Sequence, residues 1–476
     1  MNTTRLVVPD RYEGLARRAK EDLGSIVVAV EEGLARIEDI FGRMGVAGRG
    51  SFLILRGPSG AGKSTFLHTL RFFKQDVITI PVAGGVSIRE ALQAHKATQA
   101  KVEVFVLEER EAAISFTDRE LEDWLHAING FIRSVKGEKA LVVWPANTDE
   151  LCNRIVELAR RIGAETLLGS DDRSVFEFSG PSRVEYERIA ERTLAVLNQG
   201  ATFSDLGLTK ARVSSIAESS PTIGGFLTKL HDDIAENERY IQTLVNEEQC
   251  RLWIIVATGN DPQAEVAGLT RGRFAAIDTD RLLSSTGANI VTELNEFPEK
   301  IGLLGTVLDA RILHLPVLTA AAIIRSFADE PLKTKMKSVG LSLKPDDKET
   351  ALERLASTEL SSVFRAGAQG TLARGPKLGS SSFEAFAKLA NIASTNDVAL
   401  NRAVGRAFVS AGLIQSFAVE QDFGKVAKRR TDILAQTTSG PIRIEMMWRK
   451  TAGRADISNY TLIKLANYGR AIGYLD

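Results

Sequence analysis

The chain has 476 residues, with 60 Lys and Arg against 60 Asp and Glu, so its formal net charge is zero, and 44% of its residues are hydrophobic. A balanced charge excludes a protein that coats nucleic acid through bulk positive charge, without excluding a local basic surface. At about 100–200 residues per domain, this length predicts roughly two to four domains.

The two cysteines, Cys152 and Cys250, are far apart and belong to no Cys-x-x-Cys pair, so the sequence predicts neither a disulfide framework nor a zinc site. The first ten residues contain no apolar segment flanked by basic residues and do not resemble a signal peptide. The longest apolar runs, such as 140–145 and 252–257, are far shorter than the roughly 20 residues of a membrane span. We therefore expect a cytoplasmic protein without a membrane partner.

The first half of the chain predicts a helical segment followed by a parallel sheet. Residues 1–50 are rich in helix formers and show no chemistry of their own, so we expect them to pack against the next domain. Residues 51–183 alternate apolar strands with helical segments, which predicts crossover connections between parallel strands. The expected strands are Ser51–Arg56, Val77–Pro81, Val102–Leu107, Ala140–Pro145 and Ser174–Ser179.

The pattern changes after residue 183. Residues 184–245 lose the strand signal and are predicted to form several helices. Residues 246–380 form a mixed middle region, with a strand at Arg251–Thr258 and a helical pattern from Asn295 to about Ala328. Lys, Asp, Ser and Gly are frequent in residues 329–380, which predicts a linker or mobile region there.

One segment fits the phosphate-binding pattern G-x-x-x-x-G-K-[ST] of a P-loop. It consists of Gly57, Pro58, Ser59, Gly60, Ala61, Gly62, Lys63 and Ser64, followed by Thr65. Glycines let successive N–H groups point at phosphate oxygens, and the helix that begins near Lys63 adds the positive end of its dipole. We expect these residues to bind ATP, with Lys63 at the β- and γ-phosphates and the Ser64 hydroxyl on Mg²⁺. A chance match is the alternative, but the preceding strand and the following helix are what the mechanism requires.

Polar residues also follow the third and fourth predicted strands. Glu108 and Glu109 come directly after Val102–Leu107, and this arrangement resembles a Walker B strand that ends in Glu-Glu. We assign Glu108 to Mg²⁺ and Glu109 to the general base, with Glu111 as the weaker substitute. Asn147 follows the fourth strand, where P-loop ATPases with an added strand carry a polar residue that senses the γ-phosphate. The alternative is a strand that ends in solvated acids.

The order of these features resembles the AAA+ family and its relatives over about residues 50–245. The resemblance implies ATP hydrolysis with Lys63, Glu109 and Asn147 as the catalytic residues. It also implies a lid of helices over residues 184–245 and ATP-linked assembly into a homo-oligomer.

In the AAA+ family an arginine from a neighbouring subunit often completes the site. The candidates on the helix after the fourth strand are Arg154, Arg160 and Arg161, although a solvated helix face is the simpler reading. The lid carries no clear arginine at the usual second sensor position, and Lys229 is a weak stand-in.

Residues 381–476 return to a compact pattern of helices, strands and a terminal helix. A predicted hairpin places Asp432 on its first strand and Glu445 on its second. Two converging carboxylates suit a hydrolytic Mg²⁺ site. A structural hairpin with solvated acids is the alternative.

This region resembles the PD-(D/E)xK nuclease-like superfamily. The resemblance matches Asp432 and Glu445 to the two acids of that family and implies contact with DNA or another nucleic acid. Met447 stands where the family has a lysine. The terminal helix carries Lys464 on one face between Tyr460 and Tyr468. The candidate replacements for the missing cation are Lys464, Arg449 and Lys450.

The sequence thus predicts an α/β protein with a P-loop NTPase parallel sheet and helical lid, a mixed middle region and an α+β nuclease-like C-terminal domain. Three functions fit. The first is a Mg²⁺-dependent ATPase that acts on nucleic acid or partner proteins, an architecture that resembles prokaryotic genome-maintenance or anti-phage systems. The second is an ATP-dependent oligomeric scaffold whose inactive nuclease-like domain recruits DNA or an effector. The third is a small-molecule kinase, which the long segments after residue 245 disfavour.

Overall fold

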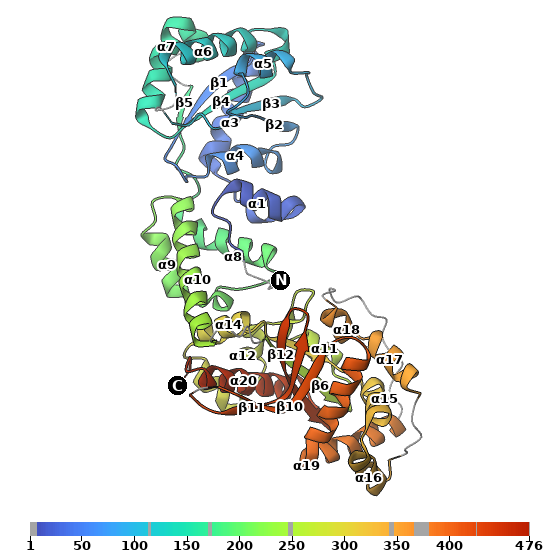
Figure 1. Ribbon diagram of the computed structural model, residues 1–476. Coiled ribbons are helices and arrows are strands. Elements are labelled where there is room, and N and C mark those ends of the chain that lie inside the picture. The colour runs from blue at the N-terminus through green and yellow to red at the C-terminus, as the bar shows by residue number, and fades with distance from the viewer. Residues whose placement is uncertain are drawn as a thin grey trace. The chain divides into compact units, whose positions relative to one another are not determined.

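The computed structural model describes residues 7–112, 116–169, 174–245, 251–341, 347–365, 380–424 and 426–475. The chain divides into two compact units, which are shown in Figure 1. The N-terminal unit comprises Val8–Val196 and Ala211–His231. The C-terminal unit comprises Met1–Val7, Leu197–Lys210 and Asp232–Asp476.

The N-terminal unit contains a sheet of five parallel strands in the order β2-β3-β4-β1-β5, so the predicted parallel sheet is confirmed. The strands are β1 (Ser51–Arg56), β2 (Val77–Val82), β3 (Val102–Leu107), β4 (Ala140–Ala146) and β5 (Val175–Glu177). Strand β4 lies between β1 and β3, so the carboxyl ends of these three strands are neighbours at one edge of the sheet. Loops at that edge are where open parallel sheets bind ligands.

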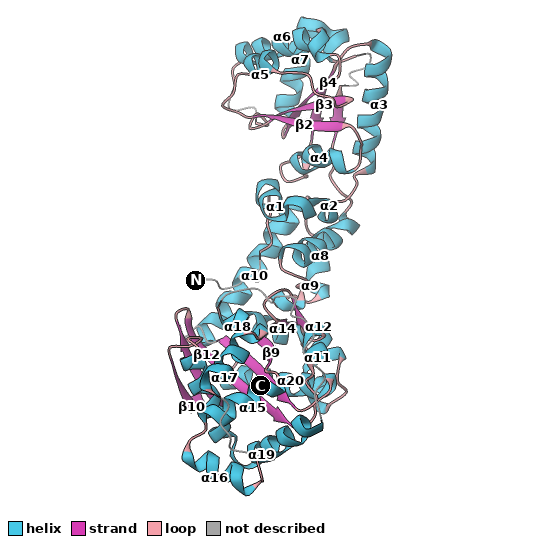
Figure 2. Ribbon diagram, turned by 90° about the vertical axis from the view of Figure 1, so that its right-hand side faces the viewer, coloured by secondary structure: helices cyan, strands magenta, loops and turns pink. Residues whose placement is uncertain are grey.

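Helices cover both faces of this sheet, as Figures 1 and 2 show. Helices α3 (Glu31–Ala47) and α4 (Lys63–Thr69) share one apolar core with the sheet. Helices α5 (Ile88–Ala94), α6 (Asp118–Ile132) and α7 (Asp149–Leu167) share the other. A sheet covered on both faces needs strands that are apolar along their whole length, which explains the continuous hydrophobic runs of β1, β3 and β4.

Of the other helices described in the first 245 residues, two have eight residues or fewer and three run from one unit into the next. They are α1 (Tyr12–Ala19), α2 (Leu23–Ile26), α8 (Tyr186–Leu197), α9 (Lys210–Glu218) and α10 (Ile223–Val245), with 3₁₀ turns at Lys20–Asp22, Leu70–Phe72, Val135–Gly137, Arg183–Glu185 and Ser204–Leu206. The segment predicted as one helical lid is therefore helical, but its residues are divided between the two units.

The C-terminal unit contains a mixed sheet in the order β10-β11-β12-β6-β9-β8-β7. The strands are β6 (Arg251–Thr258), β7 (Thr270–Arg271), β8 (Ala276–Ile277), β9 (Arg311–His314), β10 (Ser416–Phe423), β11 (Arg429–Thr437) and β12 (Gly440–Arg449). Strand β12 pairs in parallel with β6 along eight residues, from Ile442 opposite Arg251 to Arg449 opposite Thr258. The middle region and the C-terminal region, expected as separate parts, thus share one sheet and one unit.

Helices pack on both faces of this second sheet, as seen in Figures 1 and 2. They are α11 (Gln263–Ala267), α12 (Thr279–Ser284), α13 (Asn289–Leu294), α14 (Pro298–Val307), α15 (Val317–Phe327), α16 (Glu330–Ser338), α17 (Lys348–Ala356), α18 (Glu359–Phe364), α19 (Ser380–Ser410) and α20 (Arg454–Ala471). Helices α15 to α19 share one core with the sheet, whereas α12, α13, α14 and α20 share the other. Within the described part of the chain, no helix is both long enough and apolar enough to cross a membrane.

Two expectations for the middle region differ from the structure. The helical pattern from Asn295 to Ala328 is interrupted by β9, because four residues, of which Ile312 and Leu313 are apolar, are too few to show a strand period between two helices. Residues 330–338 and 348–364, expected within a linker, form helices α16 to α18, whose Leu332, Met336 and Leu355 are buried in the core. These helices have few apolar side chains among many polar ones. Their apolar face can therefore be recognised only from its packing in the core. Residues 342–346 and 366–379 lie outside the described residues.

Candidate functional site

The glycine-rich loop joins β1 to α4 at the carboxyl edge of the first sheet. Gly60 and Gly62 have φ angles of 84° and 92°, in the left-handed region that glycine adopts without strain. A Cβ atom on Gly57 would lie 2.4 Å from the carbonyl oxygen of Phe178, so this position also requires glycine. Helix α4 begins at Lys63, and the first N–H groups of a helix have no intrahelical acceptor and favour an anion.

Lys63 is the buried cation of this loop, with only 6% of its surface exposed. Its Nζ donates to Gly57 O at 2.5 Å, Pro58 O at 3.0 Å and Asn147 Oδ1 at 2.8 Å. These three acceptors are uncharged. Burial lowers the pKa of Lys63 to about 8, although the negative charge of Glu111 opposes this shift. Among the described residues, therefore, no carboxylate contacts this desolvated ammonium group.

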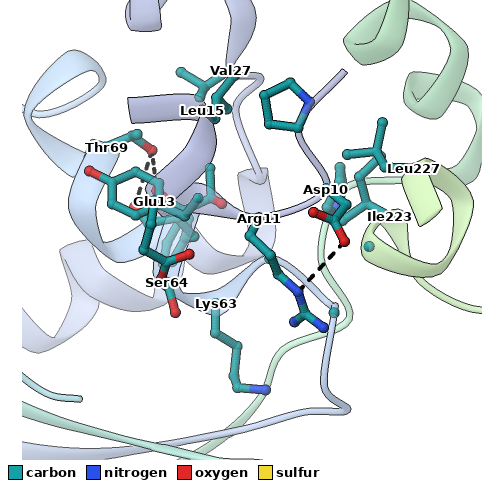
Figure 3. A pocket seen from close by; sticks show the side chains of 18 of the residues that line it. Asp10, Arg11, Glu13, Leu15, Val27, Lys63, Ser64, Thr69, Ile223 and Leu227 are labelled. Atoms are coloured by element: carbon teal, nitrogen blue, oxygen red, sulfur yellow. Dashed lines mark hydrogen bonds and ion pairs between the residues drawn. The ribbon is translucent and has the colours of Figure 1, made fainter. Parts of the chain in front are cut away.

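A cavity of about 360 Å³ opens beside the loop, a size within the usual range of small-molecule sites. Its polar wall includes Lys63 and Ser64 together with residues at the ends of β3 and β4. Figure 3 shows apolar side chains on another part of the wall. These are Leu15 from α1, Val27 after α2, and Ile223 and Leu227 from α10. The cavity can thus accept a ligand with an anionic end and an apolar end.

Three acids follow β3, and they differ in whether their side chains line the cavity. Glu109 and Glu111 line the cavity, as does Asn147 after β4, whereas Glu108 does not belong to the cavity wall. Glu108 Oε1 instead lies 2.7 Å from Nε2 of His68 on α4. The sequence pointed to Glu108 and Glu109 as the functional pair, and it could not show that Glu111 is the acid whose charge acts on Lys63.

The loop that carries these acids is held by the buried guanidinium of Arg110. Nη1 donates to Val82 O and Glu108 O, each at 3.0 Å, and Nη2 donates to Gly84 O at 3.0 Å and Val86 O at 2.5 Å. Glu109 has a φ of 58°, which is uncommon for a side chain of this size. Gly84 makes room for it, since a Cβ there would lie 2.5 Å from Glu109 Oε2. A strained conformation persists only where the surroundings hold it, and Arg110 does so here.

The N-terminal segment, for which the sequence predicted packing only, supplies part of the cavity wall. Pro9, Asp10, Arg11, Tyr12 and Glu13 all line the cavity. Arg11 extends toward the loop that carries Lys63 (Figure 3), and its Nε lies 4.0 Å from Asp10 Oδ2. No local sequence signal marks this segment, because it reaches the cavity only through the tertiary fold.

The cations suggested for subunit contacts and for the lid have partners within the chain. Arg154 Nη2 donates to Asp118 Oδ1 at 2.7 Å and to Phe116 O at 2.9 Å. Lys229 donates to Ser219 O at 3.0 Å and does not line the cavity. Residues Ile189, Ile223, Gly224 and Leu227 are the part of the predicted lid that does line it.

A second charged cluster lies in the C-terminal unit, where β11 and β12 are antiparallel. Ile433 pairs with Ile444, which sets Asp432 and Glu445 opposite each other on these strands. The backbone N–H of Met446 donates to Asp432 Oδ2 at 2.7 Å. Burial, followed by the nearby charge of Glu445, raises the pKa of Asp432 to about 7.

Glu445 is fully buried and is held by two residues of α20. Tyr468 donates its hydroxyl to Glu445 Oε1 at 2.8 Å, and Lys464 Nζ forms an ion pair with Glu445 Oε2. Tyr460, one turn before Lys464, donates to Met446 O at 3.2 Å. The helix face predicted from the spacing of these three residues therefore meets β12. Burial raises the pKa of Glu445, although Lys464 opposes this shift.

The structure separates the three cations that the nuclease-like resemblance suggested in place of Met447. Met447 is buried in the core shared with α20, and Arg449 and Lys450 are exposed after it. Of these cations, Lys464 is the one that contacts Glu445.

The two clusters differ in their fit to Mg²⁺. Around the loop, the Ser64 hydroxyl and the carboxylates of Glu109 and Glu111 line one cavity, and Mg²⁺ commonly takes one or two carboxylates beside phosphate oxygens. In the second cluster both oxygens of Glu445 are already bonded and Lys464 brings a positive charge, so this arrangement does not fit a divalent cation. The part of the chain that the structure describes contains no group of three or more His, Cys, Asp or Glu side chains arranged around a metal.

The fold defines an α/β protein with a five-stranded parallel sheet in one unit and a separate mixed sheet in the other. No protein-family model matches the chain, and a search of curated proteins finds no match. The geometry of the two clusters therefore carries the functional argument below.

Proposed function

We propose that the N-terminal unit binds ATP with Mg²⁺ at residues Gly57 to Thr65 and hydrolyses it. The observation that carries this proposal is the buried ammonium of Lys63, held by neutral oxygens at the start of α4. A desolvated cation without a contacting carboxylate gains most from an anion that arrives with the ligand. The polyphosphate tail of a nucleotide is such an anion, and the apolar wall of the cavity suits its base.

Each residue of the site has a separate role in ATP binding and hydrolysis. Lys63 binds the β- and γ-phosphates. Ser64 would hold Mg²⁺ directly and Glu108, which lies outside the cavity wall, would hold it through water, and the bound ion would neutralise charge on the phosphate oxygens. Glu109, fixed by its clamped loop, polarises the attacking water. Asn147 shares a hydrogen bond with Lys63, so it can exchange that bond for one to the terminal phosphate. Glu111 is the substitute acid, and its negative charge acts on Lys63.

The proposed class is an AAA+-like ATPase. Two features support it: β4 lies between the loop-bearing strand and the acid-bearing strand, and helices after residue 184 contribute to the cavity wall. This proposal includes a cytoplasmic homo-oligomer that acts on nucleic acid or partner proteins, in a setting such as genome maintenance or anti-phage defence.

ATP turnover by the purified chain, with and without DNA, tests the proposal. Lys63→Ala should abolish binding and turnover, and Glu109→Gln should keep binding and lose turnover. Lys101→Ala, which alters an exposed lysine of the same unit, is the matched control. A chain that takes up no labelled ATP with Mg²⁺, or a Lys63→Ala variant that matches the wild type, would remove the proposal. ADP formed only when a small-molecule acceptor is added would instead indicate a kinase.

A second candidate function is an ATP-dependent scaffold whose C-terminal unit binds nucleic acid without cutting it. The observation that favours it is Glu445, whose two oxygens are occupied by Lys464 and Tyr468 rather than open to a metal. Exposed cations near β12, including Arg449 and Lys450, can contact phosphates. The test is a nuclease assay with Mg²⁺ or Mn²⁺. Cleavage that disappears in Glu445→Gln would contradict this reading and restore a catalytic one.

A further inference from the structure

We propose that His68 is a positioning residue that orients Glu108 for the Mg²⁺ of the nucleotide site, and that Tyr12 fixes the His68 ring. This inference rests on the proposed ATPase function and adds two residues that the sequence patterns do not single out. It also gives the N-terminal segment a role in the chemistry of the site.

The first support is the placement of His68 on α4. Ser64 and His68 are four residues apart, so they share one face of this helix. His68 Nε2 lies 2.7 Å from Glu108 Oε1, and their side chains are only 12% and 34% exposed. The histidine thus joins the helix that carries the metal-binding hydroxyl to the strand end that carries the metal-binding acid.

The second support is the length of the glutamate side chain. Glu108 stands where the Walker B pattern usually has aspartate, and its carboxylate, one methylene farther from the main chain, is bonded to His68 through Oε1. Its Oε2 would then be the oxygen that holds a metal ion at Ser64 through water. Carboxylates at metal sites are generally oriented by such outer hydrogen bonds, because an unrestrained carboxylate loses entropy when it binds.

The third support is the ring of Tyr12, the first residue of α1. It stacks on the imidazole of His68 with ring centroids 4.8 Å apart and planes 12° from parallel. A flat stack opposes rotation of the imidazole about its χ2 bond, so Nε2 stays directed at Glu108. Tyr12 also lines the nucleotide cavity, as does Ser64. A continuous set of contacts therefore runs from the cavity wall through Tyr12 and His68 to Glu108.

The expected consequence concerns the metal more than the nucleotide. Loss of an outer partner of a metal site typically weakens metal binding by about 10- to 100-fold. His68→Ala should therefore raise the Mg²⁺ concentration needed for half-maximal ATP turnover by about 10-fold or more. ATP binding measured in EDTA should change little, because Lys63 and the loop are untouched.

The experiment compares five variants, one of them a control, by ATP turnover and by ATP binding over a range of Mg²⁺ concentrations. His68→Gln retains a donor and should recover part of the Mg²⁺ affinity that His68→Ala loses. Tyr12→Leu should shift the Mg²⁺ requirement in the same direction by a smaller factor, and more than Tyr12→Phe, which keeps the stacked ring. His126→Ala, which removes an exposed histidine of the same unit, is the control and should behave as the wild type.

A double variant separates positioning from a general structural role. If His68 acts through Glu108, adding His68→Ala to Glu108→Gln should cost little beyond Glu108→Gln alone. Fully additive losses, an unchanged Mg²⁺ requirement in His68→Ala and His68→Gln, or faster turnover in these variants would each overturn the proposal. The ATPase proposal survives those results, whereas a wild-type chain that neither binds nor hydrolyses ATP removes both.

Discussion

Two lysines that are partly or fully removed from solvent, one in each unit, differ in how their charges are balanced. Within the described part of the chain, Lys63 donates to three neutral oxygens, and burial lowers its pKa to about 8. Lys464 is also desolvated, which by itself lowers its pKa, but Glu445 and Asp432 outweigh that effect and raise it. The first lysine lacks a contacting counterion, and the second has one supplied by the chain itself.

The difference supports the proposal that the ligand binds near Lys63 rather than near Lys464. A cation held by dipoles alone is costly in the empty protein and becomes favourable when an anion enters. A cation paired with a buried carboxylate is satisfied already, and a further cation there would face repulsion. We therefore place ligand binding at Lys63 and structural pairing at Lys464, and the same kind of substitution at each should have opposite effects.

The largest effect is expected from Lys464→Met. It leaves the buried carboxylate of Glu445 without a counterion, and breaking a buried pair in this way typically costs about 3–5 kcal/mol. Urea unfolding at pH 8 measures it. The double variant with Glu445→Gln should recover most of the loss, because no charge then remains to be compensated. A single variant as stable as the wild type would show that the pair does not carry this charge balance.

Lys63→Met should act in the opposite way on stability. The empty protein should be as stable as the wild type or more so at pH 7, since a charged group in an unfavourable site is removed. Nucleotide turnover should fall by about 10²–10³-fold, the usual cost of losing a preorganised charge contact at a reacting phosphate. Unfolding and turnover are measured on one preparation. A variant that unfolds readily would show that Lys63 stabilises the loop rather than waiting for a ligand.

A pH dependence sharpens the comparison further. Because the pKa of Lys63 is about 8 in the empty site, the lysine loses its charge as pH rises through that value. If only the charged form binds phosphate, nucleotide affinity should fall by about 10-fold per pH unit above 8. Binding at pH 8.5 should then take up a proton, which calorimetry in two buffers of different ionisation enthalpy detects. Binding without proton uptake would contradict the assignment.

The smallest effect is expected at Asp432, whose pKa is raised to about 7. Its folded form holds a proton that the unfolded chain releases near pH 4, so this contribution to stability is full at low pH and is lost as pH rises through 7. Asp432→Asn should therefore raise the unfolding temperature by about 2–4 °C at pH 8 and hardly at all at pH 4.

Asp422→Asn, which alters an exposed acid on the neighbouring strand β10, provides the comparison for Asp432→Asn. It should show no such dependence on pH. Equal shifts of the unfolding temperature at both pH values in Asp432→Asn would mean that Asp432 does not titrate in this range.

The sheet of the N-terminal unit was largely predictable from sequence. Its strands are mostly apolar and are separated by helical segments, and this pattern indicates both their position and their parallel direction. The loop motif lies between such a strand and a helix, so its location followed as well. The structure adds β4 between β1 and β3, which no local pattern encodes, because strand order depends on which edges pair.

The C-terminal unit was less predictable. Strand β9 is short, helices α16 to α18 have few apolar residues, and β12 pairs with β6 from a region almost 200 residues earlier. The pairing of Asp432 with Glu445 could be expected from the hairpin. The choice of Lys464 as the partner of Glu445 could not, since it depends on where α20 packs.

The sequence by itself determined the residue types of the proposed phosphate-binding loop, the strand and helix on either side of it, and the acids that follow β3. Only the tertiary structure decided that the charge of Glu111 raises the pKa of Lys63, that His68 bonds to Glu108, and that the N-terminal segment lines the cavity. Local patterns report the periodic burial of neighbouring residues. Contacts between distant segments depend instead on how whole elements pack, so no window of sequence contains them.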